Sequence, residues 1–281
     1  MIDFAREKIC FYNSMYQGRS SAFEIADFAA RHGAAGIELM SFCEELREPD
    51  MTAAKEIGKY IKARSLAVPC FSTVAKLVFE EREEYVERLK KYAEICSELE
   101  IPYLHHTVDS YWGRNDSEDD KARFIELGAE ATARVNDYAA PLGVKTVIED
   151  QGYLFNGVKN YARLRELTGN KIGTLLDSGN IYFMDETAVD FAKANKDSIC
   201  HVHIKDYRYI LPEECDKWHY TSAGGKGFVG CPLGEGIADL EELSRILKSG
   251  GYNGYYSIEL EGGKSPSDFL VAMEYIEKTF S

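Results

Sequence analysis

The sequence predicts an α/β fold, a single (β/α)8 TIM barrel spanning residues 1–281. Three observations support this prediction. The chain has 281 residues, close to the roughly 250 that such barrels need. Short β-branched or aromatic segments alternate eight times with longer amphipathic ones, which is the pattern of repeated strand–helix units. Acidic or histidine side chains stand near the carboxyl ends of the last four segments, where barrel enzymes assemble their sites.

The expected strands are short runs rich in apolar, β-branched and aromatic residues, and turn-forming residues or helical segments separate them. No change in composition and no Ser- or Pro-rich linker divides the chain, so we expect one domain. In chain order, the expected strands are residues 9–13, 36–40, 67–72, 103–108, 145–150, 172–177, 199–206 and 254–261.

The helical segments show recognisable start and stop signals. The first helix is expected to begin after Ser21, in a capping box with Glu24, and to end at Gly33. Amphipathic periodicity predicts two longer helices, over residues 80–99 and about 119–140. An open doubly wound sheet alternates strands and helices in the same way, so the polar strand ends, rather than the strand count, favour the barrel.

Composition and charge exclude several classes of protein. A hydrophobic content of 45% predicts a large core and excludes intrinsic disorder. The formal net charge of −14 opposes binding to nucleic acid. No run approaches the roughly 18 apolar residues of a membrane span, and the amino terminus lacks the apolar segment of a secretory signal. The seven cysteines have no CxxC spacing, so we expect reduced thiols and a cytoplasmic protein.

Four polar side chains near the ends of the last four strands form the central candidate site. Glu149, Asp177 and His203 follow one another at intervals of about one strand–helix unit, and a longer insertion separates His203 from Glu259. The four should therefore meet at one end of the barrel. Each acid could instead form a salt bridge or a helix cap, but burying four such groups without a cation is costly. Three carboxylates and one imidazole predict one divalent ion: Mn²⁺, Mg²⁺, Co²⁺ or Zn²⁺.

Six motifs resemble those of the sugar isomerase/epimerase superfamily of xylose-isomerase-like TIM barrels. This superfamily includes ketose 3-epimerases, hydroxypyruvate isomerases, inosose dehydratases and pentulose-phosphate 3-epimerases, and the resemblance covers essentially the whole chain. The motifs are GIEL at 36–39, VIED at 147–150, LLDSGN at 175–180, HVHIKD at 201–206, PLGEG at 232–236 and SIELE at 257–261.

The resemblance implies that Glu149, Asp177, His203 and Glu259 are metal ligands, and that Glu149 and Glu259 also exchange the catalytic proton. The implied function is a divalent-metal-dependent sugar or sugar-phosphate isomerase or epimerase. In such an enzyme a carboxylate removes the proton beside the carbonyl, and the metal stabilises the resulting enediolate. The implied partner is a small-molecule sugar, with no nucleic acid and no membrane, and related barrels lead us to expect a homodimer or homotetramer.

Three positions near this set are expected to contact substrate. Asn180 stands where many epimerases have a second histidine, and in this it is similar to the phosphorylated-pentulose and dehydratase branches. Lys205 and Asp206 resemble the HxHxKD run of the inosose-dehydratase branch, although Lys205 has a rim ion pair as its alternative. Arg208 lies one residue before the position of a substrate-binding arginine in epimerases.

Strand periodicity predicts which side chains share a face. His201, His203 and Lys205 alternate along one strand, so if His203 binds metal, His201 lies one layer deeper and Lys205 lies at the rim. Glu259 and Glu261 likewise share a face. The resemblance favours Glu259 as the ligand, with Glu261 as the alternative.

Two further strand ends carry candidates. Glu38 ends the second strand and should face the barrel mouth. The resemblance implies that it touches substrate or a metal ligand, and an internal salt bridge is the alternative. His105 and His106 face opposite ways, so only one can enter the site. The resemblance favours His106 as the inward, substrate-binding histidine.

Segments outside the strands add weaker candidates. Residues 207–236 are too long for an ordinary connection, and we expect either a lid over the barrel mouth or simple packing of the aromatic residues of this segment. Trp112 is a candidate for stacking on a sugar ring. Residues 261–265 precede the last helix, whose N-cap is expected at Ser265, and are a candidate phosphate cradle.

Three other functions compete with the isomerase or epimerase. An inosose-dehydratase-like lyase would use similar proton abstraction, followed by loss of a hydroxyl group. Apurinic endonucleases share the barrel and part of the ligand set, but they need a three-metal cluster with more histidines, and the negative charge of this chain opposes DNA. A barrel that binds sugar without turnover would show stabilisation by ligand but no product.

Overall fold

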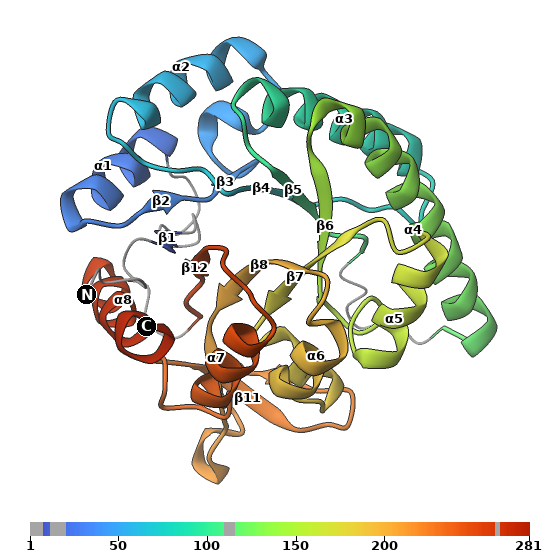
Figure 1. Ribbon diagram of the computed structural model, residues 1–281. Coiled ribbons are helices and arrows are strands. Elements are labelled where there is room, and N and C mark those ends of the chain that lie inside the picture. The colour runs from blue at the N-terminus through green and yellow to red at the C-terminus, as the bar shows by residue number, and fades with distance from the viewer. Residues whose placement is uncertain (1–7, 12–20, 110–115, 262–264) are drawn as a thin grey trace.

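A closed parallel barrel with helices around it is the architecture of the protein (Figure 1). The structure is a computed structural model, and it describes residues 8–11, 21–109, 116–261 and 265–281. The sheet closes because its two edge strands, β2 and β3, belong to one segment interrupted only at Glu38. β2 pairs with β1, and β3 pairs with β4. The predicted (β/α)8 fold is confirmed.

All eight expected strand positions contain strands. The order around the barrel is β2-β1-β12-β8-β7-β6-β5-β4-β3. The strands are β1 (Ile9–Phe11), β2 (Gly36–Ile37), β3 (Leu39–Met40), β4 (Cys70–Thr73), β5 (Tyr103–His106), β6 (Lys145–Glu149), β7 (Gly173–Asp177), β8 (Ile199–Ile204) and β12 (Tyr256–Ile258).

The helices begin close to the predicted positions. Ser21 is the N-cap of α1 and accepts a hydrogen bond from the backbone N–H of Phe23, and Gly33 ends this helix with φ 74°. The carboxylate that bonds Ser21 is Glu45 rather than Glu24, so the predicted capping partner is wrong. The helices are α1 (Ala22–His32), α2 (Met51–Lys62), α3 (Arg82–Glu98), α4 (Glu118–Ala139), α5 (Val158–Leu167), α6 (Ala188–Asn195), α7 (Leu240–Ser249) and α8 (Pro266–Phe280).

The strands separate an apolar layer from a polar one. On β8, Val202 and Ile204 join the main hydrophobic cluster, in which strand and helix side chains pack together. His201 and His203 alternate with them and contact polar groups of other strands, inside the barrel. The helices of the described chain therefore cover the apolar outer face, whereas the barrel interior holds these polar side chains and a small separate apolar cluster of Cys70, Val147 and Leu175.

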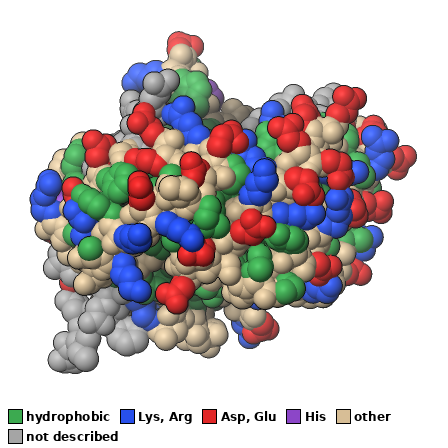
Figure 2. All heavy atoms as spheres, turned by 90° about the horizontal axis from the view of Figure 1, so that it is seen from above, with side chains coloured by type: hydrophobic (Ala, Val, Ile, Leu, Met, Phe, Trp, Pro, Cys, Tyr) green, Lys and Arg blue, Asp and Glu red, His purple; other side chains and the backbone are tan. Residues whose placement is uncertain are grey.

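The outer surface of the molecule is mixed in charge. Figure 2 shows acidic and basic side chains interspersed on the face that it displays. Among the described helices, none combines the length and the apolar character that crossing a bilayer requires.

The insertion after β8 is a folded unit rather than a plain loop. β8 ends at Ile204, earlier than expected, and a separate antiparallel sheet follows. In this sheet β11 lies between β10 and β9. Its strands are β9 (Asp206–Tyr209), β10 (Tyr220–Thr221) and β11 (Gly227–Cys231).

Asp206 anchors this insertion to the barrel. Its buried carboxylate accepts hydrogen bonds from the backbone N–H groups of Tyr207 at 2.9 Å, Gly234 at 3.0 Å, Gly236 at 3.1 Å and Ala238 at 3.0 Å. A Cβ atom at Gly236 would lie 2.1 Å from Asp206 Oδ1, so this close approach requires glycine. The last residue of HVHIKD and the PLGEG segment thus form one structural unit.

Candidate metal centre

Four strands bring the predicted ligands together at their carboxyl ends. Glu149 and Asp177 are the last residues of β6 and β7, His203 lies on β8, and Glu259 directly follows β12. One ligand atom of each residue lies within 4.8 Å of the other three. The side chains come from neighbouring strands, since β7 pairs with both β6 and β8, and β8 pairs with β12. The grouping matches the expectation, whereas the metal-binding role of the four residues stays a prediction.

The two ring nitrogens of His203 face different partners. Nδ1 lies 3.0 Å from Glu149 Oε1 and 2.8 Å from Glu259 Oε2, and Nε2 lies 3.0 Å from Glu38 Oε2. Burial lowers the pKa of His203, but Glu38, Glu149 and Glu259 outweigh burial, and the pKa is well above its usual value. Because Glu38 can only accept, Nε2 carries a hydrogen and Nδ1 is the atom available to a metal.

The carboxylates of this cluster fit a divalent cation. Asp177 Oδ2 lies 3.0 Å from Lys205 Nζ, and Glu259 Oε2 lies 2.8 Å from His203 Nδ1, so the contacts of these oxygens are with cationic groups. Three carboxylates held this close in a buried place repel one another, and a divalent cation would compensate their charge. Burial raises the pKa of Asp177 to about 7, although Lys205 opposes this effect. Three carboxylates and one imidazole are the ligand set expected for Mn²⁺, Mg²⁺, Co²⁺ or Zn²⁺.

Lys205 lies inside the cluster rather than at an exposed rim. Its Nζ is 3.0 Å from Asp177 Oδ2 and 3.1 Å from Glu259 Oε1, and the residue is only 3% exposed. Burial lowers its pKa, but the two carboxylates outweigh burial and raise the pKa well above the usual value. The ion pair that was the alternative role for Lys205 is thus present, and its contact with substrate stays a prediction.

Glu38 connects two histidines inside the barrel. Its Oε2 lies 2.8 Å from His201 Nε2 and 3.0 Å from His203 Nε2, and it accepts hydrogen bonds from the hydroxyls of Ser72 and Ser257. Glu38 occupies the interruption between β2 and β3. It therefore contacts a predicted metal ligand, which is one of the roles expected for it. His201 and His203 lie on the same inward face of β8, as the strand periodicity predicts, and their ring centroids are 5.5 Å apart.

Glu38→Gln is expected to weaken metal binding by about 10- to 100-fold, because loss of the carboxylate that orients a ligating histidine has effects of this size. Isothermal titration of the purified variant with Mn²⁺ measures the change. Glu83→Gln, at a surface ion pair with Arg134, serves as the control and should bind like the wild type. Unchanged affinity in the Glu38 variant, with circular dichroism showing an intact fold, would rule out this positioning role.

The structure reverses the predicted orientation of the two histidines on β5. His105, not His106, faces the barrel interior, where its Nδ1 lies 2.8 Å from the hydroxyl of Ser72 and its ring lies beside His203. His106 Nδ1 lies 3.0 Å from the carbonyl oxygen of Thr107. The register of β5 against β4 decides this, because Ser72, which points inward, pairs with His105.

The buried His106 predicts a stability change at acid pH. Burial lowers its pKa from 6.5 to about 4. Below pH 6.5 the unfolded chain gains a proton that the folded protein does not, so stability falls as the pH drops and levels off near pH 4. The expected loss is about 3 kcal/mol. Urea unfolding from pH 7 to pH 4 should show this loss in the wild type and a smaller one in His106→Asn. Parallel curves for the two proteins would contradict it.

The other predicted substrate residues differ in their placement. Asn180 donates its backbone N–H to Asp177 Oδ1 at 2.7 Å, and its buried side-chain nitrogen has no hydrogen-bond partner among the described residues. Arg208 pairs with Glu214 at 2.8 and 3.0 Å inside the insertion, and none of its contacts within the described chain is with the cluster. Trp112 and residues 262–264 lie outside the described residues.

Sequence reasoning missed several residues that support the centre. Asp150 Oδ1 accepts a hydrogen bond from the backbone N–H of Asp177 at 2.8 Å. Burial, reinforced by the charge of Asp177, raises the pKa of Asp150 well above its usual value. Ser72 and Ser257 hold Glu38. Their signal was a small hydroxyl residue on an otherwise apolar strand, and such a signal is too common in sequences to single them out.

The fold and the cluster together define a class: a (β/α)8 barrel with a candidate divalent-metal centre at the carboxyl ends of its strands. Residues 26–279 match the family described as xylose isomerase-like TIM barrel. The chain therefore belongs to the xylose isomerase-like TIM barrel family.

Two of the curated relatives are named inosose dehydratase. An inosose dehydratase from Clostridium perfringens is 30% identical over 160 residues, which is 54% of this chain and 54% of that protein. Another inosose dehydratase, from Geobacillus thermodenitrificans, is 25% identical over 241 residues, or 80% of each chain. The match to the first thus spans about half of its length. Both relatives are named as enzymes.

Three solved structures have the same fold. A xylose isomerase domain protein from Planctomyces limnophilus superposes with a TM-score of 0.77, 15% identity and coverage of 98% of this chain and 97% of that one. D-Psicose 3-epimerase from Clostridium cellulolyticum, with D-tagatose, superposes with a TM-score of 0.76 and 13% identity, and the match covers 98% of this chain and 99% of that one. A barrel protein from Mycobacterium smegmatis, in complex with magnesium, superposes with a TM-score of 0.74 and 14% identity, and the match covers 97% of this chain and 96% of that one. At these identities the likeness concerns the fold alone.

Proposed function

We propose that the protein is a divalent-metal-dependent lyase that removes water from a cyclic keto-polyol. The observation that carries this proposal is the buried ion pair between Lys205 and Glu259, whose Nζ and Oε1 atoms are 3.1 Å apart within the candidate metal centre. Dehydration beside a carbonyl needs a base and an acid close together, and this pair supplies both. The two relatives named inosose dehydratase support the same reading.

Glu149, Asp177, His203 and Glu259 would hold the metal ion. When bound, the ion supplies Lewis acidity that stabilises negative charge on an oxygen of the substrate. Glu38 orients the imidazole of His203, and Asp150 holds the backbone of Asp177. These contacts fix the ligand atoms before substrate arrives, which lowers the reorganisation needed during the reaction.

The resting protonation states suit this chemistry. Burial raises the pKa of Glu259, but Lys205 and His203 outweigh burial and lower it to about 2, so Glu259 is ionised at neutral pH. The raised pKa of Lys205 keeps its amine protonated. Glu259 is also the most accessible of the four predicted ligands, with 14% of its side chain exposed. A carboxylate base and an ammonium acid therefore face the same substrate.

The proton balance of the reaction closes within this pair. Glu259 takes the proton from the carbon beside the carbonyl, and Lys205 gives a proton to the hydroxyl group that leaves from the next carbon. A carbon–carbon double bond and one water molecule result. Glu259 then holds the proton taken from the carbon and Lys205 lacks one proton, so transfer of that proton from Glu259 to the adjacent Lys205 restores both groups.

A second candidate function is sugar or sugar-phosphate isomerisation or epimerisation through an enediolate. It is supported by the two carboxylates, Glu149 and Glu259, that both lie within 3.0 Å of His203 Nδ1. Two acid–base groups around one centre can remove a proton on one side and return it on another. In this case Lys205 would hold a substrate oxygen and would not protonate a leaving group.

Inosose in deuterated buffer separates the two functions. With Mn²⁺ present, the wild type should form an unsaturated product, seen as a new ultraviolet absorbance. Lys205→Met should still exchange the proton beside the carbonyl for deuterium, followed by NMR, while dehydration falls at least about 100-fold. Lys226→Met, at an exposed ion pair with Asp185, is the matched control and should behave like the wild type. Epimerised pentuloses without loss of water would favour the second function.

A further inference from the structure

A hydrogen-bond network crosses the barrel interior and ends at a predicted metal ligand. It begins at His105 on β5 and passes through Ser72 on β4. It continues to Glu38, between β2 and β3, and reaches His203 on β8. The first three residues come from segments that contribute none of the four predicted ligands. The network therefore connects the half of the barrel without ligands to the candidate metal centre.

The hydroxyl group of Ser72 has a defined direction in this network. It donates to Glu38 Oε1, and its oxygen also lies 2.8 Å from His105 Nδ1. A hydroxyl group has one hydrogen, and a carboxylate can only accept. Since the hydrogen of Ser72 is directed at Glu38, the second bond needs a hydrogen on His105 Nδ1, and Ser72 accepts it.

The state of His105 decides which way Ser72 donates. Its Nε2 is buried and has no hydrogen-bond partner among the described residues, so Nδ1 makes the hydrogen bond that orients the ring. Without a hydrogen, the lone pair of Nδ1 would compete with Glu38 for the hydroxyl of Ser72. With a hydrogen, Nδ1 occupies a lone pair of Ser72 and leaves its hydrogen to Glu38.

The bond from Ser72 holds one oxygen of Glu38 in particular. Oε2 accepts from the hydroxyl of Ser257 at 2.6 Å and lies 2.8 Å from His201 Nε2, in addition to its contact with His203. Oε1 lies 3.1 Å from His203 Nε2, and within the described chain Ser72 is its other hydrogen-bond partner. Loss of the Ser72 bond therefore releases one side of the carboxylate that orients His203.

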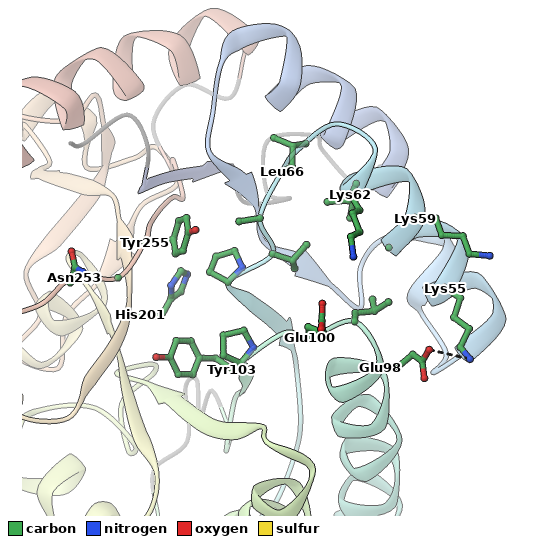
Figure 3. Close-up of a pocket in the computed structure, with 18 residues that line it drawn as sticks. Lys55, Lys59, Lys62, Leu66, Glu98, Glu100, Tyr103, His201, Asn253 and Tyr255 are labelled. Atoms are coloured by element: carbon green, nitrogen blue, oxygen red, sulfur yellow. Dashed lines mark ion pairs between the residues drawn. The ribbon is translucent and has the colours of Figure 1, made fainter. Parts of the chain in front are cut away.

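Water has little access to this network. Glu38 and Ser72 are each 1% exposed. A cavity of about 730 Å³ lies at the amino ends of the strands, and His201 lines it between Tyr103 and Tyr255 (Figure 3). Since His201 also contacts Glu38, it separates this cavity from the carboxylate. Hydrogen bonds buried in this way hold their partners firmly, because water does not compete for them.

We propose that His105 is a positioning residue for the candidate metal centre. By donating from Nδ1, it directs the hydroxyl of Ser72 at Glu38, and Glu38 then holds the ring of His203 with its Nδ1 toward the other predicted ligands. The inference rests on the proposed role of His203 as a metal ligand.

The hydrogen on His105 is the first test, and it needs neither metal nor substrate. Long-range ¹H–¹⁵N NMR of the metal-free protein at pH 7, assigned with the His105→Asn variant, should show a hydrogen on Nδ1 of His105. A ring without a hydrogen on Nδ1 would overturn the proposal. The proposed function fails separately, if isothermal titration shows that the wild type binds no divalent metal ion.

Metal affinity is the second test. His105→Leu should weaken Mn²⁺ binding about fivefold, less than the 10- to 100-fold expected when a direct partner of a ligand is lost. His105→Asn should stay within about twofold of the wild type, because its amide can donate from nearly the position of Nδ1. His106→Leu, on the opposite face of β5, is the matched control and should bind like the wild type. Equal weakening in both His105 variants would contradict the proposal.

The third test separates this network from the direct contact between the rings of His105 and His203, whose centroids are 6.0 Å apart. Ser72→Ala should weaken Mn²⁺ binding as much as His105→Leu does, and the double variant should lose no more than either one. In the metal-free protein, the ¹⁵N resonances of His203 should shift in His105→Leu and in Ser72→Ala, and return in His105→Asn. Losses that add in the double variant would assign the effect to the ring contact and overturn the proposal.

Discussion

Glu149→Gln and Glu259→Gln should each reduce turnover by about 10³-fold or more, because Glu149 is proposed to bind metal and Glu259 is proposed both to bind metal and to remove the proton. Glutamine keeps the size of the side chain but neither ionises nor accepts a proton. Both residues lie within 3.0 Å of His203 Nδ1. The rate of product formation from inosose, at saturating Mn²⁺, measures the loss.

Glu261→Gln is the matched control for this pair of variants. Glu261 shares the alternation of Glu259, but its carboxylate contacts the hydroxyl of Tyr220 in the insertion. Its variant should keep activity within a few-fold of the wild type. Full activity in Glu259→Gln together with lost activity in Glu261→Gln would transfer the proposed role to Glu261, the alternative ligand.

Asp206→Ala should lower the free energy of unfolding by about 3–5 kcal/mol, the largest stability effect that we expect from one substitution. The change leaves the backbone N–H groups of Tyr207, Gly234, Gly236 and Ala238 without their acceptor in a buried place. Urea unfolding at pH 7, followed by circular dichroism, measures the loss.

Asp239→Ala provides the comparison for Asp206. Asp239 is the exposed N-cap of α7 and accepts one backbone hydrogen bond, from Glu242 at 3.0 Å. Loss of such a cap costs about 1 kcal/mol. Equal losses in the two variants would mean that the four bonds of Asp206 do not anchor the insertion.

The sequence predicted those parts of the fold that depend on regular periodicity. The alternation of strand-like and helical segments predicted the positions of all eight strands. The signals at Ser21 and Gly33 predicted where α1 begins and ends. The grouping of Glu149, Asp177 and His203 was predictable because residues that end neighbouring parallel strands meet at one edge. These features follow from local patterns and one topological rule.

Features that depend on register or on distant partners were not predictable. The orientation of His105 and His106 depends on which residue of β5 stands opposite Ser72, and a shift of one residue exchanges the two faces. The capping partner of Ser21 is Glu45, which is distant from Ser21 in the sequence. Asp206 holds the sheet of the insertion. Its carboxylate accepts hydrogen bonds from backbone N–H groups of a loop that lies far along the sequence. One domain, a cytoplasmic location and a dimer or tetramer stay predictions.

The carboxylate of Glu38 touches two imidazoles of one strand. His203 is part of the candidate metal centre, and His201 lies deeper in the barrel. A substitution of His201 is therefore expected to disturb the carboxylate that orients His203, and to change the position of a predicted ligand atom although the substituted residue lies outside the centre.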